Sequence, residues 1–229
     1  LHSLRRRQRQ MCIRDRQNKV WVGLSKETAH QLGTPISSLM AWMDLLESSG
    51  VDPSLLSDMN KDVNRLSVIA ERFSKIGSKP EMELIYVNEV LENATEYMRR
   101  RVSDKVLITT HLPSDAEGAM VCLSLFEWVI ENLCKNAVDA MNGEGRIDVY
   151  MTSEKQQIYI DIKDTGKGIA RKNFKTVFNP GYTTKKRGWG LGLTLAKRII
   201  EDYHAGRIYV KDSEVGKGTT FRIELKRVV

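Results

Sequence analysis

One histidine stands where it can act as a nucleophile. His30 lies in a segment whose apolar residues recur three or four positions apart, or at multiples of that spacing, as on one stripe of a helix: Trp21, Leu24, Leu32, Ile36, Leu39, Met43 and Leu46. At about 100° per residue, His30 falls on the side opposite this stripe, near Thr34 and Ser37. A histidine that faces water has no packing role, and a neutral imidazole is a competent nucleophile. We therefore interpret His30 as a reactive residue.

Pro35 lies five residues after His30, inside the same periodic pattern. Proline removes a backbone donor and clashes with the carbonyl four residues earlier, here that of Gln31, so the helix is expected to bend beside the histidine. A helix end at Thr34 is the alternative, but the stripe keeps its phase as far as Leu46, which favours a bend. Thr34 lies one turn from His30, where its hydroxyl can hold a water molecule.

Four short segments downstream have the residue types of a nucleotide site. Asn132 and Asn136 lie four apart on a predicted helix, and their carbonyl oxygens suit a hard Mg²⁺ ion. Asp164 ends a predicted strand, where it can accept a hydrogen bond from the exocyclic amine of adenine. Glycines that allow a backbone to approach phosphate closely follow there and in two later segments: Gly166, Gly168, Gly188, Gly190, Gly192, Gly216 and Gly218, with Thr219 opening the last strand. Each segment alone is explained by a solvated helix face or a turn, and only the set is specific.

Two helices are predicted to position the histidine. The first ends at a turn in residues 48–54, where Asp52 is a good N-cap and Pro53 a good first residue for a second amphipathic helix. A helical hairpin of this kind cannot bury both apolar stripes by itself. We expect a homodimer in which two hairpins form a four-helix bundle; the alternative is that each stripe packs on the downstream domain.

The segment Gly77–Pro80 breaks the second helix and separates a domain of residues 17–77 from one of residues 78–229. Beyond it, the periodicity predicts an α+β pattern. The expected strands lie at about Met82–Tyr86, Val106–His111, Met120–Cys122, Arg146–Thr152, Gln157–Lys163, Arg207–Lys211 and Thr219–Leu225. The expected helices lie at about Asn88–Arg101, Leu125–Met141 and Leu191–Tyr203.

Composition and charge narrow the function classes. Hydrophobic residues make up 41% and charged residues 28%, as in ordinary globular proteins. Most of the formal net charge of +7 comes from residues 1–16, which hold six arginines against one aspartate and read as a leader extraneous to the fold. The basic balance therefore predicts no nucleic-acid function. The cysteines show no metal-binding spacing, so we expect reduced thiols in the cytoplasm, and no apolar run approaches the ~18 residues of a membrane span.

The segment AHQLGTP resembles the phosphoacceptor box of sensor histidine kinases, a pattern close to H-E-x-x-T-P. His30, Thr34 and Pro35 match it, whereas Gln31 replaces the acid that the family uses as a base, which leaves Glu27 as a candidate. The downstream segments resemble the N, G1, G2 and G3 boxes of the ATP-binding domain that histidine kinases share with gyrase, Hsp90 and MutL. The likeness covers roughly residues 19–229.

This resemblance implies a kinase core: a helical hairpin that dimerises, then an α/β-sandwich domain that binds ATP and Mg²⁺. It implies that His30 takes the terminal phosphate and passes it to an aspartate in the receiver domain of a response regulator, which Thr34 also helps to dephosphorylate. Residues 177–185 look like the family's F box and lid, which implies nucleotide contacts from Tyr182 and Thr184 and a phosphate contact from Lys185. Any membrane attachment is expected from segments outside this chain.

Two other readings stay open. An ATPase of the gyrase, Hsp90 and MutL kind would share the glycine boxes, but it usually has a glutamate where Asn132 stands. A catalytically weak dimeric scaffold, or a member biased towards dephosphorylation, is compatible with Gln31. The presence of Asn136, Asp164, Gly190 and Gly192 argues against a complete loss of activity.

Overall fold

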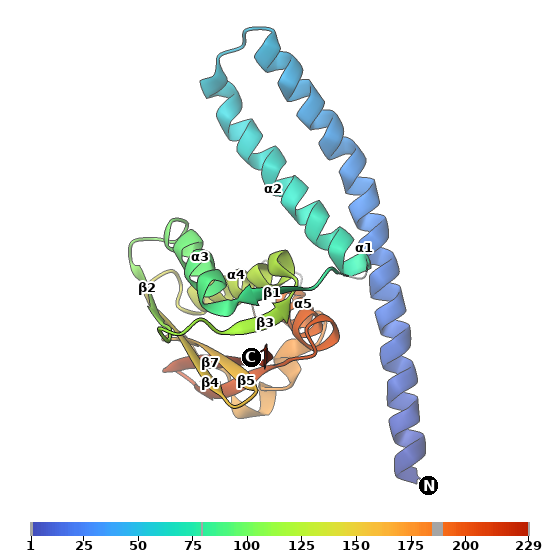
Figure 1. Ribbon diagram of the computed structural model, residues 1–229, viewed down its shortest axis with the longest axis vertical. Coiled ribbons are helices and arrows are strands. Elements are labelled where there is room, and N and C mark those ends of the chain that lie inside the picture. The colour runs from blue at the N-terminus through green and yellow to red at the C-terminus, as the bar shows by residue number, and fades with distance from the viewer. Residues whose placement is uncertain (1, 79, 185–189, 229) are drawn as a thin grey trace. The chain divides into compact units, whose positions relative to one another are not determined.

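The computed structural model of the chain describes residues 2–78, 80–184 and 190–228. The chain divides into two compact units, Leu1–Pro80 and Glu81–Val229. We call them the hairpin unit and the sheet unit, and Figure 1 shows the elements of each. Among the described residues, no helix combines the length and apolar character that crossing a membrane requires.

The hairpin unit consists of α1 (His2–Ser48) and α2 (Pro53–Gly77). α1 runs through Pro35 without a break, so the alternative of a helix end at Thr34 is wrong. The same helix includes residues 2–16, which the sequence had left out of the fold. At the turn, Gly50 has φ +80°, the left-handed conformation common just past a helix end. Asp52 caps α2 as predicted, because its carboxylate accepts a hydrogen bond of 2.9 Å from the Ser54 amide.

Only part of each predicted stripe is buried within the hairpin. The buried cluster consists of Ile36, Met43, Leu56, Val63 and Ala70, with Leu32 and Val51 packed against it. Four stripe residues that lie between them along the two helices remain about 40–50% exposed: Leu39, Leu46, Met59 and Leu66. The hairpin alone therefore buries only about half of the apolar residues in its two stripes.

The sheet unit is an α+β fold, as predicted. Its strands are β1 (Glu83–Tyr86), β2 (Val106–His111), β3 (Gly118–Val121), β4 (Gly145–Glu154), β5 (Gln157–Asp164), β6 (Arg207–Glu214) and β7 (Gly218–Val228). Its helices are α3 (Val87–Arg99), α4 (Leu123–Ala140) and α5 (Gly192–Arg198), with short 3₁₀ turns at Arg171–Asn173 and Thr176–Phe178. The expected helix Leu191–Tyr203 is α-helical only to Arg198, and Ile199–Tyr203 forms a π-turn.

The strands form one sheet in the order β1-β3-β7-β5-β4-β2, and β6 also pairs with β7. The β2–β4 pair is parallel and the other pairs are antiparallel. β7 is the centre of this arrangement, since it pairs with β5 and β6 along its length and with β3 at its end.

The two faces of the sheet differ in chemistry. One face lies against α3, α4 and α5 (Figure 1) and buries aliphatic residues of the central strands, such as Ile147, Ile160 and Ile223. The other face carries ion pairs. Asp161 there binds Arg222 through two bonds of 2.6 and 2.7 Å and Lys211 through one of 2.6 Å. Alternation of apolar and charged residues along each strand produces this division.

Cys122 and Cys134 are buried at and within α4, and both are free thiols. Burial, with a smaller contribution from the nearby Glu131 charge, raises the pKa of the Cys134 thiol to about 12. The thiolate is the reactive form, so this cysteine acts as a small apolar residue of the core. The side chain of Cys12 lies outside the part that the structure describes.

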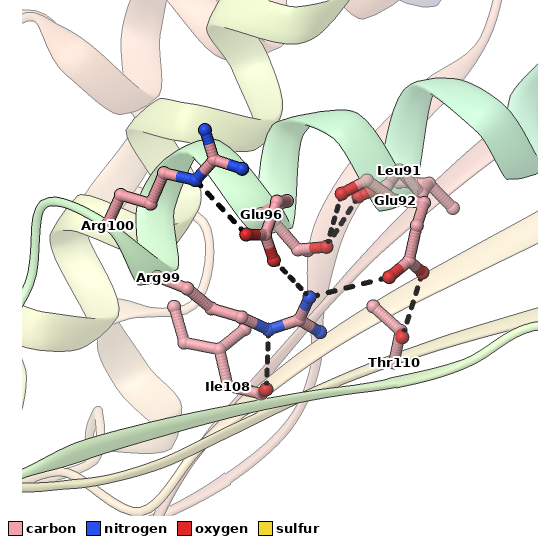
Figure 2. A network of polar contacts seen from close by, with 8 residues as sticks. Leu91, Glu92, Glu96, Arg99, Arg100, Ile108 and Thr110 are labelled. Atoms are coloured by element: carbon pink, nitrogen blue, oxygen red, sulfur yellow. Dashed lines mark hydrogen bonds and ion pairs between the residues drawn. The ribbon is translucent and has the colours of Figure 1, made fainter. Parts of the chain in front are cut away.

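A polar network joins α3 to β2 (Figure 2). Arg99 donates to the Ile108 carbonyl at 3.1 Å, and it pairs with Glu96 at 3.1 Å and Glu92 at 3.4 Å. Glu92 in turn accepts a 3.0 Å bond from the Thr110 hydroxyl. Thr110 and Ile108 are residues of β2, a strand at the edge of the sheet, so the network fixes that edge to the helix layer.

We expect Arg99→Ala to lower the free energy of unfolding by about 1–2 kcal/mol, because a carbonyl and two carboxylates lose a partly buried cation. Arg100 is the matched control: it also pairs with Glu96, at 3.1 Å, but its side chain is 76% exposed. Arg100→Ala should leave the urea midpoint close to that of the wild type. Equal losses in the two variants would contradict a role for the contact with Ile108.

Candidate functional site

The first part of the site is the side of α4 that carries Asn132 and Asn136. Burial of residues such as Val129 and Leu133 fixes the helix against the sheet and leaves both asparagines half-buried at its edge. Asn132 lies against the start of α5. A Cβ on Gly192 would come within 2.6 Å of Asn132 Oδ1 and 2.9 Å of Nδ2. Glycine at this position therefore lets two of the predicted segments meet.

Asp164, at the end of β5, is the most buried charged residue among the predicted site residues, with 3% of its surface exposed. Its Oδ1 atom accepts hydrogen bonds from the amides of Gly166 at 2.8 Å and Thr219 at 3.3 Å. Burial raises the pKa of the Asp164 carboxyl above its usual range, and the two amides oppose that effect in part. A buried carboxylate of this kind gains from a further donor, such as the amine of a ligand.

Backbone hydrogen bonds hold the glycine-rich turn after Asp164 between α4 and the β6–β7 turn. The Lys167 amide donates to the Ala140 carbonyl at the end of α4, at 3.0 Å, and the Lys167 carbonyl accepts from the Gly216 amide at 2.9 Å. These contacts, with those of Thr219 and Gly192, bring the four segments predicted from the sequence together in one region. The sequence order alone does not require this, because the segments are separated by strands and helices.

Contacts hold the described part of the segment between the first glycine group (Gly166 and Gly168) and the second (Gly190 and Gly192). Phe178 is buried and packs edge-on against Phe221, with ring centroids 6.1 Å apart, as expected for a packing anchor. The Gly181 amide donates to the Gly190 carbonyl at 3.2 Å, where Gly190 has φ +64°. Lys167 Nζ donates to Thr184 Oγ1 at 2.8 Å.

The neighbouring Tyr182 is half-buried and its amide donates to the Asn179 carbonyl at 3.1 Å. The predicted phosphate-binding residues Lys185 and Gly188 lie outside the described residues. Their roles stay predictions, as do the ligand contacts assigned to Tyr182 and Thr184.

Ser213 belongs to this region but was missed from the sequence. Its hydroxyl accepts a 2.7 Å bond from the Ile169 amide, donates to the Gly218 carbonyl at 2.9 Å and lies 2.9 Å from Thr219 Oγ1. It thereby joins the turn after Asp164 to the start of β7. No motif signalled it, because a serine near the end of a strand is common on a solvated face.

His204 is a second residue that the sequence analysis overlooked. It is buried, and its Nε2 atom accepts a 3.1 Å bond from the Cys122 amide at the start of α4. Its Nδ1 atom lies 2.7 Å from the Ile199 carbonyl in the π-turn, to which it donates. Burial lowers the pKa of His204 below its ordinary value of 6.5. The neutral ring thus ties the segment after α5 to the helix that carries the asparagines.

We expect His204 to make the fold sensitive to mild acid. The unfolded chain binds a proton at a higher pH than the folded one, so the contribution of His204 to stability is full above its ordinary pKa of 6.5 and falls as the pH drops below that value. His204→Gln should lower the free energy of unfolding by about 1–3 kcal/mol at pH 7 and flatten this slope. Urea titrations at a series of pH values measure both. His111→Gln, at an exposed histidine, should keep the slope.

In the hairpin unit, His30 and Thr34 are both exposed and lie one turn apart on α1. They line a shallow surface depression whose other residues are small: Ala29, Gly33, Ser37, Ser38 and Ala41. This agrees with the predicted position of His30 away from the apolar stripe. Small neighbours leave the imidazole accessible to a large substrate.

The chain is similar to known proteins in both sequence and fold. Residues 123–229, from the start of α4 onward, match the family described as histidine kinase-, DNA gyrase B- and HSP90-like ATPases. Sporulation kinase E of Bacillus subtilis is 30% identical over 209 residues, which cover 88% of this chain and 28% of that protein. Residues 123–229 belong to this ATPase family, and the chain resembles sensor histidine kinases over most of its length. Its ATPase-type domain holds every described residue of the predicted nucleotide site.

Solved structures of histidine kinases share this fold. Full-length ShkA in complex with AMPPNP has a TM-score of 0.68 and 18% identity, covering 90% of this chain and 46% of that one. Histidine kinase ThkA in complex with the response regulator protein TrrA has a TM-score of 0.59 and 19% identity, covering 90% and 61%. The chain spans less than half the length of the curated relatives that it matches.

Proposed function

We propose that the chain is the kinase core of a sensor histidine kinase. It transfers the terminal phosphate of ATP to His30 and then to an aspartate of a response regulator. The observation that carries the proposal is that one chain combines an accessible histidine, one turn from Thr34, with an assembled set of asparagine, aspartate and glycine segments of the ATPase type. Because the reaction consumes ATP, we propose that it takes place in the cytosol.

The residues of the sheet unit suit a nucleotide. Asp164 offers a buried carboxylate to the amine of adenine, and the half-buried side chains of Asn132 and Asn136 offer amide oxygens beside α5. The structure of ShkA with AMPPNP supports this use of the fold. Lys185, Tyr182, Thr184 and Gly188 are proposed to contact the nucleotide from the segment before α5. Catalysis then rests mainly on positioning and charge neutralisation.

Mg²⁺ is proposed as the metal that accompanies ATP. The described residues contain no cluster of three or more histidine, cysteine, aspartate or glutamate side chains that could hold a metal by itself. This fits an ion that keeps most of its waters and takes only one or two protein oxygens, here Asn136 and Asn132. When bound, Mg²⁺ neutralises charge on the phosphates.

The phosphate acceptor is proposed to be the receiver domain of a response regulator. The structure of ThkA with the response regulator TrrA, a protein of the same fold, supports this choice of partner. Thr34 shares the exposed surface of His30, where its hydroxyl can orient a water molecule. We therefore propose that Thr34 also takes part in removing phosphate from the regulator.

We further propose that two hairpins form a four-helix bundle. Leu39, Leu46, Met59 and Leu66 continue the buried stripe but are left exposed by the hairpin, and a second copy of the same hairpin is complementary to them. Burial of such residues is worth roughly 1.5–3 kcal/mol for each side chain, which is enough to drive association. The dimer would place two copies of His30 in one assembly.

A charge on the exposed half of the stripe should separate the subunits. We expect Leu39→Glu or Leu66→Glu to weaken dimerisation by at least about 100-fold, because each dimer would bury two unpaired carboxylates. Light scattering after size-exclusion chromatography measures the mass. Leu107→Glu, at a residue of β2 that is 61% exposed, is the matched control and should leave the mass unchanged. A monomeric wild-type protein would contradict the bundle.

The central experiment is incubation with Mg²⁺ and γ-labelled ATP. We expect acid-labile label on the wild type and none on His30→Gln, while His111→Gln, at another exposed histidine, stays labelled. Label that persists in His30→Gln would overturn the assignment of the acceptor. An unlabelled wild type that still binds nucleotide would favour the catalytically weak scaffold instead.

A further inference from the structure

A histidine that attacks phosphorus has to release a proton, and the structure points to the group that takes it. We propose that Glu27 is this proton acceptor and that Gln31 positions its carboxylate. The inference rests on the proposed function, in which His30 is the phosphate acceptor. It adds a second catalytic residue and a positioning residue to the hairpin unit.

Glu27 and His30 face the same groove. This groove, of about 560 Å³, lies between α1 and α2, and its lining includes Lys26, Ser37, Ser67 and Glu71 as well as Glu27 and His30. On a helix, residues three apart are neighbours, with about 5–6 Å between their Cβ atoms. Glu27 lies three residues before His30, so its carboxylate is within a side chain's reach of the imidazole.

A hydrogen bond holds the Glu27 carboxylate in place. Gln31 Nε2 donates to Glu27 Oε1 at 2.6 Å, across one turn of α1. Both side chains are exposed, so without this bond the glutamate would sample many rotamers. The donor is a neutral amide, which orients the carboxylate without adding a positive charge beside it. The carboxylate keeps its second oxygen for a proton.

Glu71 is the other carboxylate among the described residues of this groove. It forms an ion pair of 2.9 Å with Lys75 on α2. This ion pair already engages one oxygen of the Glu71 carboxylate. Glu27 is also on the same helix as His30, whereas Glu71 reaches the groove from the other helix. These two differences favour Glu27.

The proposed step is balanced in atoms and charge. One ring nitrogen of the neutral His30 attacks the γ-phosphorus with its lone pair and forms the N–P bond. The bond from that phosphorus to the bridging oxygen breaks, and its electron pair leaves with ADP. The proton on the other ring nitrogen passes to the Glu27 carboxylate, so the product is a neutral phosphorylated ring beside a protonated glutamic acid.

The test compares the rate of label transfer from γ-labelled ATP to the full chain. We expect Glu27→Gln to slow labelling by about 100-fold, in the range that general base catalysis contributes, with unchanged affinity for ATP. Glu71→Gln is the matched control, because it removes the same charge from the same groove, and its rate should stay within about two-fold of the wild type. A Glu27→Gln rate equal to the wild type would overturn the proposal.

A swap of the pair separates chemistry from structure. The double variant Glu27→Gln/Gln31→Glu keeps an amide–carboxylate pair across the same turn and moves the carboxylate to the adjacent position. Recovery of at least about ten-fold of the lost rate is expected if the carboxylate acts on the proton. A double variant as slow as Glu27→Gln would show that position 27 acts through structure and would overturn the proposal. An unlabelled wild type would instead refute the proposed function itself.

Discussion

Asp164→Asn should weaken ATP binding by about 100-fold or more without lowering the melting temperature of the protein. The raised pKa of Asp164 means that its ionised form costs folding free energy, and this cost is present as the pH rises above the carboxyl's folded-state value. The amide keeps an oxygen for Gly166 and Thr219 but presents a donor where the amine of adenine needs an acceptor. Calorimetric titration with ATP and thermal denaturation measure the two effects.

Asp161 is the matched control, because it lies three residues earlier on the same strand and faces the opposite side of the sheet. Burial alone would raise the pKa of Asp161, but bonds from Arg222 and Lys211 outweigh that effect and lower it. Its contribution to stability is therefore present above a pH of about 3.8 and is lost in stronger acid. Asp161→Asn should cost at least about 1 kcal/mol of stability and leave ATP affinity intact. A loss of both properties in Asp164→Asn would contradict a binding role.

Gly192→Ala and Gly166→Ala should fail in different ways. The added methyl at position 192 meets the end of the Asn132 side chain, at 2.6 Å from Oδ1, and an amide group can rotate away. The methyl at position 166 meets the backbone of Ala140, at 2.7 Å from its carbonyl carbon, which cannot move without shifting the end of α4. We expect Gly166→Ala to lose about 1–3 kcal/mol of stability.

Gly192→Ala should keep most of its stability and lose nucleotide binding, because the asparagine that moves is a proposed ligand of the metal. Thermal denaturation and ATP titration of the two variants, side by side, check the difference. Retained ATP affinity in a stable Gly192→Ala protein would show that the position of Asn132 does not matter for binding.

Much of the secondary structure of the sheet unit can be predicted from its local sequence. β2 occupies Val106–His111, the predicted range, because the strand is short, β-branched and bounded by turn residues. α4 and the β4–β5 hairpin also lie within two residues of their predicted ends. In these elements the periodicity of the sequence agrees with the observed burial, so tertiary packing does not change the secondary structure that the local sequence favours.

The features that the sequence did not predict depend on contacts in the folded structure. The last turn of the helix expected to reach Tyr203 is a π-turn, whose carbonyl at Ile199 binds the ring of His204. Ser213 faces Thr219 because a register shift between Val210 and Asp212 adds one residue to β6 and reverses which side chains point inward. Neither feature leaves a local signal. The bond between Gln31 and Glu27 also leaves no local signal. The motif shows that Gln31 replaces an acid, but it does not show that Gln31 donates a hydrogen bond to Glu27.

The pairing of β7 has a consequence for how the sheet unit is made. Strands β3, β5 and β6 all pair with β7, and β7 follows them in the chain. During synthesis, the asparagine helix and Asp164 emerge long before the strand that supplies Thr219, so their segments cannot close into a site until residues 218–228 have left the ribosome. Such late, long-range closure is slow. A nascent chain of this design therefore cannot assemble the proposed nucleotide site until its sheet unit is complete.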